Sequence, residues 1–342
     1  MPGNPNADWA GEVLFSGRTF LFGRIDGSVI GQVTLAPDGR FEGYQSQNER
    51  SWGIMHRMLV FFGDNDAPTT VFNEIDWSQP AVTLYGQFLP HGPGRFHVLV
   101  EQPMGEAATS KYIDRLRAFD FGAPPTPNVP QEPGYFPEGW YSDHPYLREA
   151  VQEIGAKLIL DVGSFIGGSA SRLATYARET SSGGDFLVVA IDTWQGSVEH
   201  YKERGLDPIF THGRMLTTFL ENMARAGVSD HVIAFPQTST TAAKVLRKLG
   251  VMVDLVYLDA SHEYDDVTHD LESYWPLVRE GGLMIGDDYE EPHNDVIRAA
   301  DDFSRRHSLP IVPKVAPATT GTGLVLPKQR KFVFRKPITS IP

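Results

Sequence analysis

The sequence predicts two parts, a doubly wound α/β domain over residues 140–342 and, before it, a smaller antiparallel β domain over residues 1–120. From about residue 140, continuous apolar segments alternate with amphipathic ones, which is typical of a parallel sheet covered by helices on both faces. Between residues 11 and 100, short segments rich in aromatic and β-branched residues alternate with turn sequences. That pattern favours antiparallel strands joined by hairpins.

In the N-terminal part, turn sequences such as DG, PDG and GPG separate six segments of strand character, which indicates an antiparallel sandwich or barrel. The segments are FSGRTFLFG, SVIGQVTL, GRFEGY, RMLVFF, TTVFNEI and AVTLYGQFL. Trp9, Tyr44, Trp52 and Phe72 are candidates for exposed rings that stack on sugars, although such residues more often form a core. Residues 121–139 contain six prolines without periodicity and are expected to be an extended linker.

In the C-terminal part, strands and helices are expected to alternate along the chain. Strands are predicted at 157–162, 186–192, 231–236, 253–259 and 281–288. Helices are predicted near 168–179, 214–227, 240–250, 267–278 and 294–306. Gly227 is a plausible C-cap. The segments LPIVPKVA, GTGLVLP and KFVFRKP are expected to close the sheet as final strands.

Charge and composition exclude several classes of protein. With 30 basic and 43 acidic residues, the chain carries a net charge of −13, whereas nucleic-acid binders and proteins of anionic membrane surfaces need a basic face. The absence of cysteine excludes disulfides and thiolate metal sites. No secretory signal and no apolar run of membrane-spanning length is present. We therefore expect a soluble, cytoplasmic protein.

A glycine-rich turn, DVGSFIGGSA, follows the first predicted strand and opens a helix. Gly163, Gly167 and Gly168 would allow a ligand to approach the backbone closely, although a tight turn is an equally good explanation. Asp192 ends the second strand, where a carboxylate can accept both hydroxyls of a ribose. Because the turn lacks a GxGxxG fingerprint, the pocket suits a nucleoside without pyrophosphate.

Asp259, Asp287 and Asp288 follow the fourth and fifth strands. If these strands are neighbours, about 4.8 Å apart, the carboxylates converge and cannot all stay ionised without a cation. Oxygen ligands suit a hard divalent ion, Mg²⁺ before Ca²⁺. The alternative is that some of these acids cap helices or face solvent.

His262 lies in the turn after the fourth strand, close to the expected metal. There a neutral imidazole could act as general base towards an alcohol whose pKa a metal lowers. A surface position or a structural hydrogen bond is the alternative.

Four stretches together resemble the class I S-adenosylmethionine-dependent methyltransferases, and the resemblance covers roughly residues 140–310. They are DVGSFIGGSA, IDTWQGS, FLENMARAGVSDHVIAFPQTSTTAA and the block from VDLVYLDASHEYDD to GGLMIGDDY. The last block is similar to the metal-dependent sugar O-methyltransferases of the mycinamicin and tylosin type, from natural product biosynthesis.

The resemblance implies a Rossmann-like methyltransferase domain that binds S-adenosylmethionine and Mg²⁺. It assigns Asp259, Asp287 and Asp288 to the metal and His262 to the base. It places the cofactor at Asp161, Gly163, Ser164 and Asp192, with Ser239 near the adenine. The N-terminal part is similar to small β modules that accompany polysaccharide-modifying proteins, which points to a carbohydrate acceptor.

Three other functions stay open. The acceptor could be a catechol-like small molecule, although catechol enzymes usually have Asp-Asn where this chain has Asp287-Asp288. The chain could be an inactive carbohydrate-binding protein on a methyltransferase fold, but a degenerate site would be expected to lack some of these groups. A nicotinamide oxidoreductase is disfavoured by the glycine turn. Oligomeric relatives suggest a homo-oligomer, which nothing in the sequence requires.

Overall fold

The structure is a computed structural model. It describes residues 14–76, 81–90, 94–102, 109–123, 144–181, 184–197, 214–319 and 325–338. The chain divides into two compact units, Met1–Phe119 with Arg247–Val251 and Asp120–Leu246 with Met252–Pro342. The domain limits read from the sequence, 1–120 and 140–342, stay predictions. The expected linker lies outside the described residues apart from its first three.

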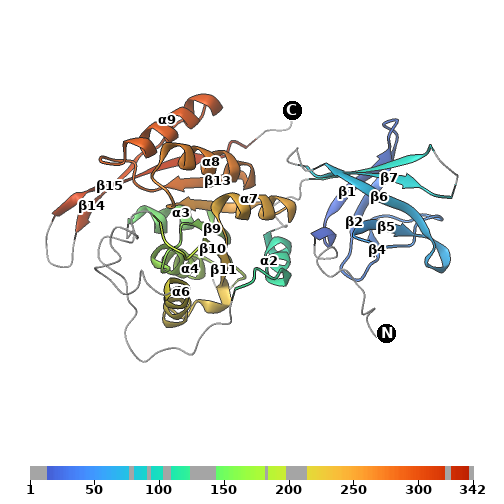
Figure 1. The fold of residues 1–342 in the computed structure, drawn as a ribbon, viewed down its shortest axis with the longest axis horizontal. Coiled ribbons are helices and arrows are strands. Elements are labelled where there is room, and N and C mark those ends of the chain that lie inside the picture. The colour runs from blue at the N-terminus through green and yellow to red at the C-terminus, as the bar shows by residue number, and fades with distance from the viewer. Residues whose placement is uncertain are drawn as a thin grey trace. The chain divides into compact units, whose positions relative to one another are not determined.

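The first unit contains one antiparallel sheet of eight strands (Figure 1), in the order β3-β2-β1-β8-β7-β6-β5-β4. Its strands are β1 (Thr19–Arg24), β2 (Val29–Leu35), β3 (Phe41–Glu42), β4 (Ser51–Met55), β5 (Met58–Phe62), β6 (Pro68–Asp76), β7 (Thr83–Phe88) and β8 (Phe96–Glu101). A bridge between Arg40 and Ser51 joins the two edges. The sheet therefore closes into a small barrel, one of the two architectures expected, because closure leaves no unpaired edge along this bridge.

The aromatic residues of this barrel lie mainly inside it. Trp52 and Phe72 are buried, Trp52 donates its indole N–H to the Ala36 carbonyl at 3.0 Å, and Phe72 contacts Phe61. Tyr44 is half-buried against Phe22, and Trp9 lies outside the described residues. Of the two roles considered for these rings, a core position is therefore confirmed for Trp52 and Phe72, and neither is exposed for stacking on a sugar.

The second unit is built on a seven-stranded sheet in the order β11-β10-β9-β12-β13-β15-β14. Its strands are β9 (Leu158–Val162), β10 (Leu187–Asp192), β11 (Val232–Pro236), β12 (Val253–Leu258), β13 (Val278–Gly286), β14 (Lys314–Thr319) and β15 (Val325–Arg335). The first five strands in this order are parallel, whereas β15 runs antiparallel to β13 and to β14. Strand order reverses between β9 and β12, where open α/β sheets bind their ligands.

Helices cover both faces of this sheet, as the continuous apolar strands predicted. They are α3 (Tyr146–Ile154), α4 (Gly168–Thr180), α6 (Arg214–Arg225), α7 (Ser239–Lys248), α8 (Tyr264–Tyr274) and α9 (Asn294–His307). Residues of α3, α4 and α6 share one core with the strands, while Phe303 of α9 packs on Phe334 of β15. Among the described residues, no helix combines the length and apolar character needed to cross a bilayer.

Three local features differ from the predictions and one agrees. Val278 begins β13 instead of ending a helix, because a 3₁₀ turn at Trp275–Leu277 stops α8 early. One strand, β15, replaces the last two of the three expected C-terminal strands. The helices α2 (Thr109–Ala118) and α3 were not predicted, since each is short and its apolar residues are few. Gly227 does adopt the left-handed conformation expected of it after α6.

Gly163 holds the strand-switch region together because it leaves room for a neighbouring backbone. Its φ is +88°, and an added Cβ would overlap the Asp259 carbonyl, which lies past the end of β12. Replacing Gly163 would therefore combine backbone strain with a clash against main chain that cannot rotate away.

We expect Gly163→Ala to destabilise the second unit by about 3 kcal/mol or more. Gly227→Ala is the matched control, because it too is left-handed but has no neighbour within 4 Å of the added carbon. It should cost only about 1 kcal/mol. Urea denaturation of each variant measures both costs, and equal losses would show that the clash at Gly163 is relieved by movement.

Candidate functional site

The ends of β9, β12 and β13 form one continuous edge in the second unit. The Asp259 N–H donates to the Val162 carbonyl at 2.8 Å, and the Asp287 N–H donates to the Leu258 carbonyl at 3.0 Å. These two hydrogen bonds tie the turns after the three strands to one another. The expected convergence of the acids after neighbouring strands is therefore present, since β12 and β13 are paired in parallel.

Asp161, on β9, is a fully buried carboxyl group with one oxygen unused. Its Oδ2 accepts a hydrogen bond from the Ser169 hydroxyl at 3.0 Å, whereas its Oδ1 has no partner among the described residues. Burial raises the pKa of Asp161 to about 6, against the opposing effect of Ser164 and Ser169. An unsatisfied buried acceptor is costly, and a ligand that donates an N–H or O–H would satisfy it.

The predicted glycine turn is shaped by contacts within the protein. Gly167 has φ +91°, and a Cβ there would overlap Met223 of α6. Together with the contact of Gly163 to Asp259, this packing explains why both positions are glycine. Close approach of a ligand to this backbone stays a prediction. The Ser164 hydroxyl donates to the Asp161 carbonyl at 2.8 Å and so fixes the same turn.

Asp192, at the end of β10, is held by backbone N–H groups, those of Phe165, Trp194 and Thr193. Its Oδ2 accepts the Phe165 N–H at 2.8 Å, and its Oδ1 accepts the Trp194 N–H at 2.7 Å. Burial nevertheless raises its pKa. Each carboxylate oxygen can accept a second hydrogen bond, so the group stays available to a pair of hydroxyls in a fixed orientation.

Ser239 is the first residue of α7. Its carbonyl accepts the Tyr274 hydroxyl at 2.8 Å. A hydrogen bond with Ser239 opposes the effect of burial on Asp270, whose pKa is raised to about 6. Because Asp270 also lines the acidic pocket, Ser239 borders the predicted site through this carboxyl group.

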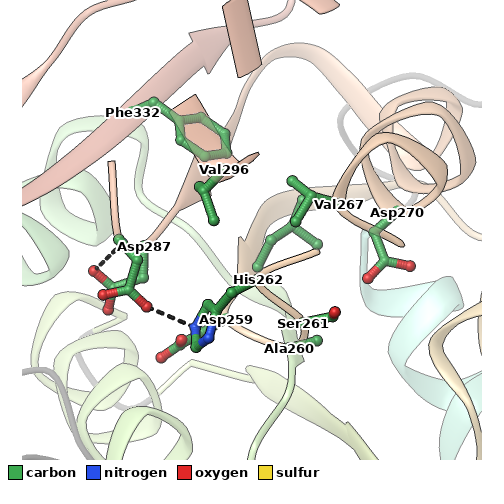
Figure 2. A pocket seen from close by; sticks show the side chains of 11 residues that line it. Asp259, Ala260, Ser261, His262, Val267, Asp270, Asp287, Val296 and Phe332 are labelled. Atoms are coloured by element: carbon green, nitrogen blue, oxygen red, sulfur yellow. Dashed lines mark hydrogen bonds and ion pairs between the residues drawn. The ribbon is translucent and has the colours of Figure 1, made fainter. Parts of the chain in front are cut away.

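Four of the predicted residues line a pocket at the strand ends. They are Asp288 and the three labelled in Figure 2, Asp259, His262 and Asp287. Val267, Val296 and Phe332 form its apolar part. The pocket therefore brings the proposed metal ligands and the proposed base to one place.

Asp287 is the most heavily hydrogen-bonded of these acids. Its Oδ1 lies 2.6 Å from the Lys331 ammonium and accepts the Asp288 N–H at 2.9 Å. Its Oδ2 accepts the Tyr257 hydroxyl at 2.5 Å. Burial is the largest effect and acts to raise the pKa of Asp287, but Lys331 and the hydrogen bonds from Tyr257 and Asp288 together lower it below its ordinary value.

Asp259 lacks such compensation. Burial, followed by the charges of Asp287 and Asp288, raises its pKa well above the ordinary value. The Tyr257 oxygen lies 3.3 Å from Asp259 Oδ2, but the single hydroxyl proton is nearer to Asp287. A divalent cation would keep Asp259 ionised, so the donor set fits an oxygen-ligated metal.

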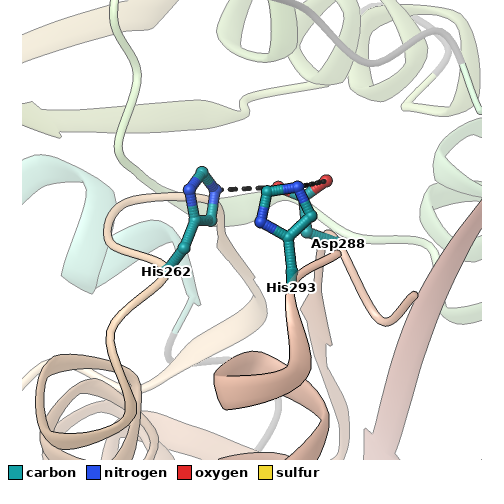
Figure 3. Close-up of side chains that lie close together, drawn as sticks. All are labelled: His262, Asp288 and His293. Atoms are coloured by element: carbon teal, nitrogen blue, oxygen red, sulfur yellow. Dashed lines mark ion pairs between the residues drawn. The ribbon is translucent and has the colours of Figure 1, made fainter. Parts of the chain in front are cut away.

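His262 and Asp288, which line this pocket, form a group with His293 (Figure 3). His262 Nε2 lies 2.9 Å from Asp288 Oδ2, and His293 Nε2 lies 3.9 Å from Asp288 Oδ1. One possible ligand atom from each residue lies within 4.8 Å of the other two. The sequence analysis missed His293, although its place directly before α9, after the Asp287-Asp288 pair, was a signal.

Residues 160–289 match a family model described as a methyltransferase domain. The matched segment is less than half of the chain and runs from β9 to just beyond β13. No curated protein sequence matches the chain.

Three of the solved structures to which the chain is similar are methyltransferases. The O-methyltransferase TomG from Streptomyces achromogenes, involved in tomaymycin synthesis and in complex with SAM, is 16% identical, with 56% of this chain and 78% of that chain covered and a TM-score of 0.40. An O-methyltransferase from Bacillus cereus in complex with SAH is 17% identical, with 68% and 92% covered and a TM-score of 0.40. Precorrin-6y C5,15-methyltransferase from Geobacter metallireducens is 10% identical, with 59% and 93% covered and a TM-score of 0.42.

At these identities and TM-scores, the likenesses say nothing about the cofactor, the metal or the acceptor of this chain. The family match is the finding that carries weight. It confirms the prediction that the C-terminal part of the chain contains a methyltransferase domain and that the protein is an enzyme of this class.

Proposed function

We propose that the chain is an S-adenosylmethionine-dependent O-methyltransferase that deprotonates its acceptor hydroxyl beside a Mg²⁺ ion. One observation carries the proposal. A methyltransferase domain places a buried carboxyl group with an unused oxygen, Asp161, on the strand next to that of the acidic pocket containing Asp259 and His262. Cofactor and acceptor would then meet at the edge where α/β sheets bind their ligands.

The cofactor would lie across the ends of β9 and β10. Asp161 would accept a donor group of the cofactor, and Asp192 would accept the ribose hydroxyls through the lone pairs that its backbone partners leave unused. The remaining proposed contacts are Gly163, Ser164, Gly167 and Ser239.

Asp259, Asp287 and Asp288 would hold the Mg²⁺ ion. When bound, the ion lowers the pKa of the acceptor hydroxyl. His262, which contacts Asp288 through Nε2, would take the proton. Bound S-adenosylmethionine would supply the methyl group: the acceptor oxygen would bond to the methyl carbon as the carbon–sulfur bond breaks, with S-adenosylhomocysteine as the leaving product. In-line positioning of the three atoms supplies most of the remaining catalysis.

For the acceptor, we propose a hydroxyl group of a sugar, of a glycosylated small molecule or of a polysaccharide. The support is the resemblance of the block from Asp254 to Tyr289 to sugar O-methyltransferases, in particular its Asp287-Asp288 pair. The buried Trp52 and Phe72 give this proposal no support from the barrel. The net charge of −13 argues for an acceptor other than nucleic acid.

Calorimetric titration with S-adenosylhomocysteine, in Mg²⁺ and in chelator, tests the proposed cofactor directly. We expect micromolar binding, about −8 kcal/mol, and no heat with NAD. Absence of binding under both conditions would contradict the proposed activity and leave an inactive member of the fold. Binding would justify screening sugars and catechols for methyl transfer.

Asp161→Asn should weaken S-adenosylhomocysteine binding by about tenfold or more, because a charged acceptor is lost. The same variant should stabilise the free protein at pH 7. Folding raises the pKa of Asp161 from 3.8 to about 6. Above pH 6, ionisation of Asp161 therefore lowers the free energy of unfolding of the wild type by up to about 3 kcal/mol. This advantage should shrink as the pH falls towards 4, where folded Asp161 is protonated. Urea denaturation at pH 7, 5.5 and 4 measures it, and equal cofactor affinities would remove Asp161 from the site.

His262→Ala should lower kcat about 100-fold or more with an acceptor found by screening. The affinity for S-adenosylhomocysteine should not change. His307→Ala is the matched control, because His307 has the same side-chain exposure of 33% and also contacts a carboxylate, Glu272. A loss confined to KM would instead make His262 a contact to the acceptor.

A further inference from the structure

Lys331 is a buried cation that neither the charge pattern nor the resemblance indicated. It lies on β15, which pairs antiparallel with β13 so that Phe332 is opposite Gly286. This register brings Lys331 next to Asp287, one residue beyond the end of β13. The side chain is 0% exposed, and a lysine is almost never buried to this extent unless it is paired.

The ammonium group makes its polar contacts within the acidic network. It lies 2.6 Å from Asp287 Oδ1 and donates to the Tyr257 hydroxyl at 3.0 Å, while that hydroxyl donates to Asp287 Oδ2. Lys331 therefore contacts Asp287 directly and also through Tyr257. It thus places a positive charge against one of the several carboxyl groups that line the pocket.

These contacts leave Asp287 with one place for a further ligand. A carboxylate offers about four lone-pair positions, and two on Oδ1 are taken by Lys331 and the Asp288 N–H. Tyr257 takes one on Oδ2, so a single position on Oδ2 stays available. A metal ion can thus bind Asp287 through one oxygen without displacing Lys331.

We propose that Lys331 is a positioning residue of the metal centre, which holds Asp287 for one-oxygen coordination and sets the charge of the ion that the pocket accepts. The inference rests on the proposed metal site. Asp259, Asp287 and Asp288 carry three negative charges when ionised, and the ammonium cancels one of them. A divalent ion cancels the other two and leaves a neutral centre, which is the most favourable state for buried charges.

Removing the ammonium changes this balance in a predictable direction. Without it, a divalent ion leaves one negative charge uncompensated, whereas a trivalent ion gives a neutral centre. A purely structural lysine would not make this distinction, because loss of packing weakens every ion alike.

The test is the binding of Mn²⁺ and Tb³⁺ to the full chain without cofactor or acceptor, in wild type and in Lys331→Met. Mn²⁺ is followed by electron paramagnetic resonance and Tb³⁺ by its luminescence. We expect the ratio of Tb³⁺ affinity to Mn²⁺ affinity to rise about tenfold or more in the variant, because one nearby charge is removed at low dielectric.

Three variants complete the design. Lys331→Arg keeps the charge and should keep the wild-type ratio. Lys336→Met removes another lysine of the same chain segment, bonded to the Trp275 carbonyl, and should leave both affinities unchanged. The double variant Lys331→Met with Asp287→Asn removes one charge of each sign and should return the ratio towards wild type. Removing both partners of a buried pair is also better tolerated than removing one, so this variant serves if the single one does not fold.

Affinities for both ions that fall in proportion in Lys331→Met would overturn the proposal and leave Lys331 a structural residue. A double variant that keeps the single variant's ratio would also overturn it. If wild type binds neither ion, the metal part of the proposed function fails together with this inference. The titration with S-adenosylhomocysteine would still decide the methyltransferase activity separately.

Discussion

Carboxyl groups buried close together need positive charge, and the site depends on how this need is met. Lys331 forms an ion pair with Asp287, and His262 contacts Asp288. Among the described residues, Asp259 has no cationic partner at a comparable distance. Burial first, and then the charges of Asp287 and Asp288, raise the pKa of Asp259 well above its ordinary value. A divalent ion is the simplest remedy, because it supplies charge to the same oxygens that the proposed chemistry requires.

The fold brings these groups together from distant parts of the sequence. Parallel pairing of β12 and β13 places Asp259 near Asp287, and the reversed strand β15 adds Lys331 from the opposite direction. At the strand switch, the packing of Gly163 on the Asp259 carbonyl fixes the distance between the proposed cofactor side and the acidic side. The chemistry therefore depends on main-chain geometry as much as on the side chains themselves.

Much of this arrangement is predictable from sequence, for identifiable reasons. Buried parallel strands have continuous apolar segments, so β9 to β13 and the acids at their ends could be located. The position of Lys331 beside Asp287 could not be predicted, because the register of its strand is set by tertiary pairing. For Trp52 and Phe72 the sequence left a core position and an exposed position open, since a closed and an open sheet have the same alternating pattern. The position of His293 depends on the conformation of the turn before α9, which no periodic pattern of residues predicts.

The most direct measurement is anomalous diffraction at the manganese edge, from crystals grown with Mn²⁺ and S-adenosylhomocysteine. We expect one strong peak within coordination distance of Asp259, Asp287 and Asp288, with Lys331 still paired to Asp287. The sulfur of the cofactor product should face this peak across the pocket. Crystals that contain S-adenosylhomocysteine but show no manganese among these carboxylates would contradict the central claim that the acidic pocket is a cation site.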